Sequence, residues 1–249
     1  MEKSVIQHSI EAYWSAMAPY FSTMIQQDLN LHGSSVWLQT IVKHAPKRAA
    51  MDVLDVGAGP GFFSIILSKA GNRVIGIDCS GEMLKEARAN ADARMVNPLF
   101  LKMDSHSMGF PDNCFDLVVS RDVTWNLYDP EEAYKEWKRV LRPGGRILIF
   151  DAHYGRYCVD GVHLKYMNKL FLSDKLRPAW DISALSLLGM DVYTDTDVDR
   201  ELYTSQDKRL HAAEPRFMVA AEKRLEVVKS THTFCTGSWN ITQTKIRWD

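Results

Sequence analysis

Three glycines and an aspartate stand at a spacing that suits the binding of an adenosine. Gly57, Gly59 and Gly61 follow an apolar run that ends at Val56, and Asp78 ends a second apolar run further along the chain. Glycine lets a turn approach a ligand where a Cβ would clash, and the first amides of a following helix point at polar ligand atoms. A carboxylate at the end of the next strand accepts hydrogen bonds from a ribose diol. The pattern predicts an adenosine-binding site.

The order of residues within the glycine turn separates two classes of cofactor. Dinucleotide enzymes need G-x-G-x-x-G, because a pyrophosphate lies on the helix amino terminus and the third glycine allows close packing. Here the turn reads G-A-G-P-G, and Phe62 stands where the third glycine of that pattern would fall. Pro60 also fixes φ and removes an amide donor that a pyrophosphate would use. The turn therefore favours a ligand smaller than a dinucleotide.

Five ordered segments resemble those of the class I S-adenosylmethionine-dependent methyltransferases, and together they cover residues 50 to 151. They are D-V-G-A-G-P-G from Asp55, I-D-C-S-G-E-M-L from Ile77, D-S-H from Asp104, G-F-P-D-N-C-F-D-L-V-V from Gly109 and L-R-P-G-G from Leu141. The resemblance implies a doubly wound, mostly parallel, seven-stranded α/β sheet. It also implies S-adenosylmethionine as the cofactor and S-adenosylhomocysteine as the product.

The resemblance implies which residues bind the cofactor, and several of them have a second interpretation. Asp55 would contact the methionine amino group or only bond backbone groups of the loop, and Asp78 would bind the ribose or cap the next helix. Met83 would cover the adenine or belong to the core. Asp104 would accept the adenine amino group or form a turn, and the two residues after it would contribute mainly backbone groups. The expected set is Tyr20, Asp55, Gly57, Gly59, Gly61, Asp78, Cys79, Met83, Asp104, Ser105, His106 and Arg121.

The methyl acceptor is expected at the carboxyl ends of the strands, where open α/β sheets bind ligands. Methyl transfer from a sulfonium is an in-line displacement, so the protein mainly positions and desolvates the nucleophile. The candidates for positioning the acceptor or acting as a base are His153, Tyr154 and Trp125, and those for substrate contact are Tyr13, Trp14, Asp122, Asn126 and Tyr157. A place in the hydrophobic core would explain each aromatic residue equally well.

Alternating strand and helix patterns position these residues. Strand-like runs from Val53 to Ser120 alternate with helical ones, which is typical of a parallel sheet with helices on both faces. Asp129, Pro130 and Glu132 predict the start of a further helix, with a cap, a first-turn proline and a capping-box carboxylate. The P-G-G segment from Pro143 is expected to end this helix, and a strand is expected over residues 146–150.

The chain divides into three expected parts. Residues 1–46 predict a helical cap, which Pro19 would break into two helices. The core is expected over residues 47–224, with a helical substrate-recognition insertion at about 152–189 and a closing pair of strands that includes an antiparallel edge. The insertion contains two helix-like stretches, around 159–171 and around 181–188. Residues 225–249 would form a C-terminal extension.

Charge and cysteine content disfavour several classes of protein. Lys and Arg number 30 against 31 Asp and Glu, without a basic segment, so no nucleic-acid partner is expected. The four cysteines form no C-x-x-C pair, so neither a disulfide framework nor a metal site is expected. No apolar run reaches the roughly 20 residues that span a bilayer, and a secretion signal is not evident. We expect a cytoplasmic protein without a membrane partner, a monomer or homodimer.

These observations predict methyl transfer to oxygen, nitrogen or sulfur of a small molecule. Enzymes that methylate the amino group of DNA adenine would be expected to carry an Asn/Asp-Pro-Pro-aromatic run after the fourth strand, where this chain has S-R-D-V from Ser120. Two alternatives stay open at this point. One is methylation of a protein or an RNA, and the other is a catalytically inactive module that binds S-adenosylmethionine.

Overall fold

A seven-stranded sheet organises the computed structural model, which describes residues 3–30, 33–152, 170–196, 198, 202 and 216–225. The strand order is β3-β2-β1-β4-β5-β7-β6. Strands β1 to β5 are parallel, and β7 is antiparallel to both β5 and β6. This confirms the doubly wound, mostly parallel sheet. The elements are α1 (Lys3–Asn30), α2 (Gly33–His44), β1 (Asp52–Val56), α3 (Phe62–Lys69), β2 (Arg73–Asp78), α4 (Gly81–Asp92), β3 (Leu99–Lys102), β4 (Phe115–Arg121), η1 (Thr124–Asn126), α5 (Pro130–Val140), β5 (Leu141–Ala152), α6 (Ala179–Leu187), β6 (Met190–Asp195) and β7 (Arg216–Lys223).

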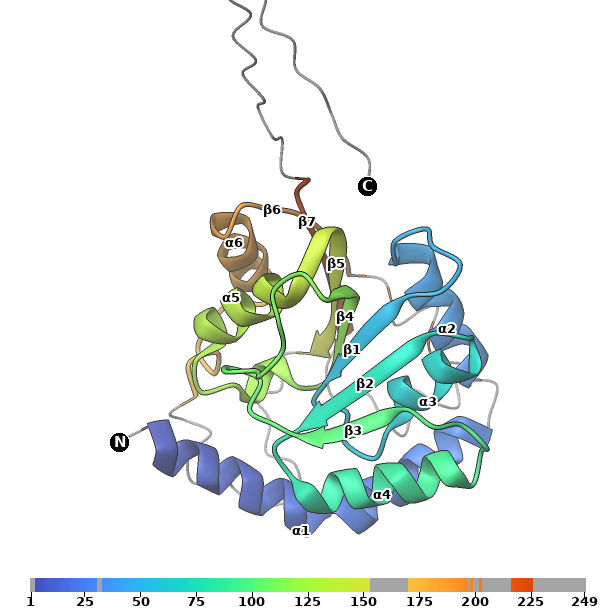
Figure 1. The fold of residues 1–249 in the computed structure, drawn as a ribbon. Helices are drawn as coiled ribbons and strands as arrows, with labels where there is room; N and C mark the ends of the chain where they lie inside the picture. The colour runs from blue at the N-terminus through green and yellow to red at the C-terminus, as the bar shows by residue number, and fades with distance from the viewer. Residues whose placement is uncertain are drawn as a thin grey trace, which may run out of the picture.

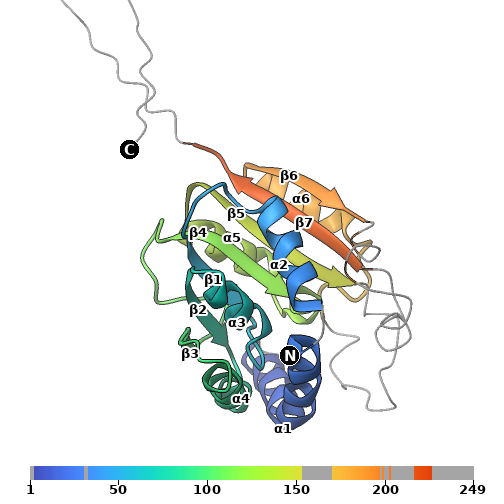
Figure 2. The same ribbon diagram turned by 90° about the vertical axis from the view of Figure 1, so that its right-hand side faces the viewer.

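Helices cover both faces of the sheet. Helices α2 and α3 lie on one face, and α5 and α6 lie on the other (Figure 2). Successive side chains of a strand point to opposite faces, so a strand covered on both sides is apolar throughout. In β4, Leu117 and Val119 pack with Trp37 of α2, whereas Val118 packs with Trp137 of α5.

Helix α1 is continuous over 28 residues, so the predicted break at Pro19 is wrong. Proline lacks the amide that would bond the carbonyl of Ser15, and this weakens a helix locally. The neighbouring residues Ala18 and Ser22 are both buried, which holds the helix against the domain on each side of Pro19. Helix α1 runs alongside α4 in both views (Figures 1 and 2). None of the described helices, α1 included, is long and apolar enough to cross a membrane.

The predicted start of α5 is confirmed, whereas β5 begins earlier than expected. The Asp129 side chain accepts a hydrogen bond from the amide of Glu132 at 3.1 Å, and Pro130 is the first helical residue. Strand β5 begins at Leu141 and continues through the P-G-G segment, with an irregularity in its pairing with β4. Extra residues on one strand of a pair are accommodated in this way by a bulge.

The region after β5 is described in part. Helix α6 corresponds to the second helical stretch expected in the insertion, and β6 with β7 forms the expected closing pair. The first helical stretch, around 159–171, lies mostly outside the described residues, as does the extension over 226–249.

Candidate active site

The glycine turn joins β1 to α3 at the carboxyl edge of the sheet. Gly57 has φ of 68°, and a Cβ on it would lie 2.3 Å from Cγ2 of Val123, closer than real Cβ atoms come to other atoms. Gly61 has φ of 95°, and its Cβ would lie 3.2 Å from Cβ of Ala87. Both positions need glycine for conformation and for space. Side chains at these two positions would therefore prevent the conformation of the turn. A loop that passes close under a ligand requires such a conformation.

Asp78 is bonded directly to this turn. Its Oδ2 accepts a hydrogen bond from the amide of Gly59 at 3.0 Å, and its Oδ1 accepts one from the amide of Ser80 at 2.8 Å. Burial raises the pKa of Asp78, although these two backbone hydrogen bonds act in the opposite direction. A carboxylate has about four lone-pair sites, so each oxygen retains capacity for a further donor.

The glycine turn follows β1, which flanks the topological switch point together with β4, and Asp78 ends the neighbouring strand β2. The chain passes from β1 to β2 and β3 on one side, and β4 pairs with β1 on the other. Ligands of open α/β sheets bind in the crevice outside the carboxyl ends of strands at such a point. The glycine turn and Asp78 therefore lie where the fold supports a ligand.

Asp55 lies beneath the turn and bonds the start of α3. The residue is buried, and its Oδ2 accepts hydrogen bonds from the amide of Ser64 at 2.9 Å and from its hydroxyl at 2.7 Å. Burial raises the pKa of Asp55 to about 7, although both bonds from Ser64 oppose the shift. Asp55 thus makes backbone contacts near the loop, and its contact with the methionine part of a cofactor stays a prediction.

Asp104 follows β3 and forms a compact cluster with two rings. Its Oδ1 accepts hydrogen bonds from the amide of His106 at 2.9 Å and from Nδ1 at 2.6 Å, and its Oδ2 accepts one from the hydroxyl of Tyr128 at 3.1 Å. Burial raises the pKa of Asp104, but the bonds from His106 outweigh it and lower the pKa overall. The His106 ring stacks on Tyr128 with 3.8 Å between centroids, and the Ser105 carbonyl accepts the indole N–H of Trp137 at 3.2 Å.

The predicted adenine and ribose neighbours lie at the start of α4. The amide of Met83 donates to Oγ of Ser80 at 3.1 Å, and the Met83 side chain is buried. Cys79 is partly buried beside the aromatic residues of α1, and burial raises the pKa of its thiol. Cys79 is therefore a neutral side chain at neutral pH.

Three predicted acceptor-side aromatics meet between α1 and η1. Tyr13, Trp14 and Trp125 pack around the buried pair Ile10 and Leu170. The ring centroids of Trp14 and Trp125 are 6.2 Å apart, and those of Tyr13 and Trp14 are 5.1 Å apart, both edge to face. The structure thus brings these residues together from distant parts of the chain.

The remaining α1 residue of the expected set is placed differently. The Tyr20 side chain is 58% exposed and packs edge to face on Phe21. Its contact with a cofactor carboxylate stays a prediction.

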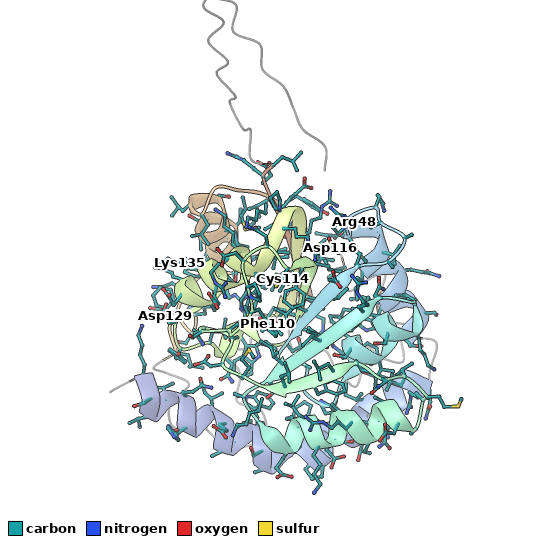
Figure 3. All side chains as sticks on the ribbon, viewed as in Figure 1. Arg48, Phe110, Cys114, Asp116, Asp129 and Lys135 are labelled. Carbon is teal, nitrogen blue, oxygen red and sulfur yellow. The ribbon has the colours of Figure 1, made fainter. Side chains whose placement is uncertain are left out.

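Two exposed ion pairs attach the amino-terminal half of α1 across this edge of the sheet. Nζ of Lys3 lies 2.5 Å from Oδ2 of Asp129, at the start of α5. Lys102 at the end of β3 pairs with Glu11. Figure 3 shows Asp129 directly above the amino-terminal end of α1. Helix α1 therefore covers the carboxyl edge where the site residues gather.

The loop after β4 contains the next predicted residues. Asp122 has φ of 58°, an uncommon conformation for a residue other than glycine, and its side chain pairs with Arg216. Arg121 donates to Asp28 at 3.2 Å, and its guanidinium lies 4.8 Å from the ring of Trp37 and 4.7 Å from that of Phe62.

Asn126, the substrate candidate in η1, is buried in the same loop. Its side-chain Oδ1 meets no donor among the described residues, whereas its backbone N–H donates to the carbonyl of Val123 at 2.9 Å.

A buried ionic network, which the sequence did not predict, lies beneath this loop. Arg177 donates to Asp181 from Nε at 2.9 Å and from Nη2 at 2.8 Å, and to Asp151 from Nη1 at 3.1 Å. Oδ2 of Asp151 also accepts the amide of Trp125 at 2.9 Å. The network therefore fixes the backbone of a predicted acceptor-side residue. A carboxylate ending the apolar run I-L-I-F-D was the one signal that pointed to Asp151.

Three predicted residues cannot be compared with the structure. His153, Tyr154 and Tyr157 lie outside the described residues. Their roles in positioning the acceptor or in proton transfer stay predictions.

Comparison with known proteins agrees with the fold. Residues 54–149, from β1 to β5, match the family model of a methyltransferase domain. The demethylmenaquinone methyltransferase of Thermus thermophilus is 32% identical over 55% of this chain and 63% of its own length. The malonyl-[acyl-carrier protein] O-methyltransferase of Erwinia billingiae is 36% identical over 45% of this chain and 43% of its own length. The chain thus matches less than two thirds of either relative.

A solved structure shows the same architecture. The crystal structure of the YcgJ protein from Bacillus subtilis superposes with a TM-score of 0.56 and 21% identity, over 79% of this chain and all of that one. At this identity the likeness concerns the fold alone. The sequence match makes residues 54–149 similar to methyltransferase domains, and the solved structure adds agreement in the fold.

Proposed function

We propose that this chain transfers a methyl group from S-adenosylmethionine to a small molecule. One observation carries the proposal: the glycine turn after β1 and Asp78 at the end of β2 are hydrogen-bonded to each other, beside the switch point between β1 and β4. The match to a methyltransferase domain over residues 54–149 supports the same conclusion.

The cofactor would lie along the carboxyl edge from Asp55 to Asp104. Asp78 would accept the ribose hydroxyls, Met83 would cover the adenine and Asp104 would accept the adenine amino group. Asp55 would face the methionine ammonium, and a positive charge nearby would lower its raised pKa and favour the carboxylate. When bound, the cofactor supplies a methyl carbon activated by a sulfonium.

The chain's own residues would hold the acceptor in line with that carbon. Tyr13, Trp14 and Trp125 offer apolar and aromatic contacts on the side of α1, and Oδ1 of Asn126 offers a buried hydrogen-bond acceptor. Helix α1 would exclude water from the reacting atoms, which strengthens positioning. The acceptor electron pair forms the new bond to carbon, the C–S electrons pass to sulfur, and the acceptor then gives up its proton to a base or to water.

Relatives indicate the range of acceptors to test. Their names are demethylmenaquinone methyltransferase, C-methyltransferase of ubiquinone/menaquinone biosynthesis, and malonyl-[acyl-carrier protein] O-methyltransferase. We therefore propose carbon acceptors in addition to the oxygen, nitrogen and sulfur acceptors predicted from the sequence.

Transfer of label from methyl-labelled S-adenosylmethionine tests this proposal. The acceptors should be a cell extract filtered to small molecules, reduced demethylmenaquinone, and separate protein and RNA fractions. We expect label in a small-molecule fraction with the wild-type protein and none with Asp78→Ala. Label confined to protein or RNA would reject the small-molecule acceptor, and cofactor binding without any transfer would favour an inactive binding module.

A further inference from the structure

Asn90 on α4 connects the glycine turn to α1 through one buried side chain. The residue is 2% exposed. Its Nδ2 donates to the carbonyl of Pro60 at 3.1 Å and to Oγ of Ser22 at 3.2 Å. Its Oδ1 accepts a hydrogen bond from Nε2 of Gln26 at 2.9 Å. Pro60 lies within the glycine turn, and Ser22 and Gln26 lie on α1. Both polar side-chain atoms of Asn90 therefore take part in connecting the turn to α1.

A second connection runs in parallel at the other side of the turn. Oγ of Ser15 on α1 lies 2.9 Å from Oγ of Ser80. The amide of Ser80 bonds Asp78, and Asp78 bonds the amide of Gly59. Two chains of hydrogen bonds therefore connect α1 to the turn, one ending at Gly59 and the other at Pro60.

The surface that α4 presents to the turn leaves little freedom for the Pro60 carbonyl. One helical turn before Asn90, Ala87 lies where it would come within 3.2 Å of a Cβ on Gly61. A buried carbonyl without a donor costs about 1–3 kcal/mol, so Asn90 selects the loop conformation in which that carbonyl points at α4.

We propose that Asn90 is a positioning residue that fixes the cofactor-binding conformation of the turn and couples it to the docking of α1. The inference rests on the proposed function, because it assigns a role in binding the same cofactor. An asparagine suits the position, since its amide group supplies two donors and one acceptor. Coupling is reciprocal. A ligand that stabilises the turn also stabilises the docked position of α1, and docking of α1 raises the affinity for the ligand by the same factor.

Titration calorimetry with S-adenosylhomocysteine tests the positioning role. Asn90→Leu keeps the size of the side chain but leaves the Pro60 carbonyl without its donor, and we expect an affinity on the order of 10-fold lower. Gln26→Ala removes one of the two contacts between Asn90 and α1 and leaves the bond to Pro60, and we expect a smaller loss of about 2- to 5-fold. Ile147→Val, a core change on β5 outside the site, serves as a control for general destabilisation and should bind as the wild type does.

Hydrogen exchange distinguishes coupling from a purely structural role. Saturating S-adenosylhomocysteine should slow amide exchange over residues 15–26 of α1 in the wild type and in Ile147→Val, but not in Asn90→Leu. Wild-type affinity and wild-type slowing in folded Asn90→Leu would overturn the inference. If that variant does not fold, unchanged affinity in both Gln26→Ala and Ser22→Ala would overturn it. Failure of the wild-type protein to bind would instead overturn the proposed function, and this inference with it.

Discussion

The two ends of the sheet hold their aspartates in different ways. At the amino ends, Asp52 lies 2.6 Å from Nε of Arg73 and 2.9 Å from Nη2 of Arg142. Asp116 lies 2.9 Å from both Arg48 and Arg142. Figure 3 shows Arg48 and Asp116 on the opposite side of the molecule from α1.

At the carboxyl ends, amides and hydroxyls replace the arginines. Asp78 bonds the amides of Gly59 and Ser80, and Asp55 bonds Ser64. The pKa of Asp52 is lowered by its hydrogen bond from Arg73, whereas burial raises the pKa of Asp55 and of Asp78.

The contrast separates a stabilising arrangement from a binding one. An arginine neutralises a carboxylate and occupies its oxygens, and such a pair joins elements together. An amide orients a carboxylate without neutralising it, so the group remains a strong acceptor for a hydroxyl or an ammonium. Asp55 and Asp78 thus remain acceptors at the carboxyl edge, whereas Asp151, paired with Arg177, and Asp122, paired with Arg216, are exceptions there.

Removing Arg177 should have the largest effect on stability. The change Arg177→Met leaves Asp151 and Asp181 buried without their cation, and we expect the free energy of unfolding to fall by about 3–5 kcal/mol. Urea denaturation of the wild type and the variant measures this difference. A loss smaller than about 1 kcal/mol would show that the network behaves like an exposed ion pair.

Removing Asp78 should have the largest effect on binding. We expect Asp78→Ala to weaken S-adenosylhomocysteine on the order of 100-fold, or about 2.7 kcal/mol, because the ribose loses its acceptor and Gly59 loses its anchor. Calorimetry measures the affinity. Asp52→Ala, at the opposite end of β1, is the matched control and should bind normally. Equal S-adenosylhomocysteine affinities for the two variants would contradict the distinction between the carboxyl ends and the amino ends of the strands.

Asp55 should produce a pH dependence of stability with an unusual sign for a carboxylate. Its folded-state pKa of about 7 exceeds the ordinary value of 3.8, so the folded state binds more protons between these limits. Its stabilising contribution is complete below pH 3.8 and is lost as pH rises through about 7, by at most about 1.4 kcal/mol per pH unit. Urea denaturation from pH 5 to 8 should show this slope in the wild type and a flatter one in Asp55→Asn. Identical slopes would contradict the assignment.

Weakening the amino-end pairs should have the smallest effect. Arg142→Gln removes ion pairs to Asp52 and Asp116 but leaves Arg48 and Arg73 in place, and we expect a loss of about 1 kcal/mol in the free energy of unfolding. S-adenosylhomocysteine affinity should not change. A weaker affinity would show that the amino-end pairs also shape the carboxyl edge.

Local patterns made much of the fold and part of the site predictable. Strands β1 to β4, the glycine turn and the cap at Asp129 depend on neighbours within a few residues, and the structure shows them where the sequence predicts them. Asp78 was predictable because the end of a strand beside a glycine turn is defined by spacing. In the structure the amide of Gly59 donates to Asp78, so the residues related by this spacing are in direct contact.

Contacts between distant segments were not predictable from one sequence. Pro19 reads as a helix breaker, yet tertiary packing at Ala18 and Ser22 accompanies an unbroken helix. Asn90 and Arg177 look like ordinary exposed helix and loop residues, because no local pattern reveals that their partners lie on other elements.

A crystal structure with S-adenosylhomocysteine tests the central claim most directly. We expect the ribose hydroxyls within hydrogen-bonding distance of Asp78 and the homocysteine part over Gly57 to Gly61, with the arginine pairs of Asp52 and Asp116 unchanged. A ligand bound elsewhere, or a carboxyl edge filled by the protein's own side chains, would contradict the account.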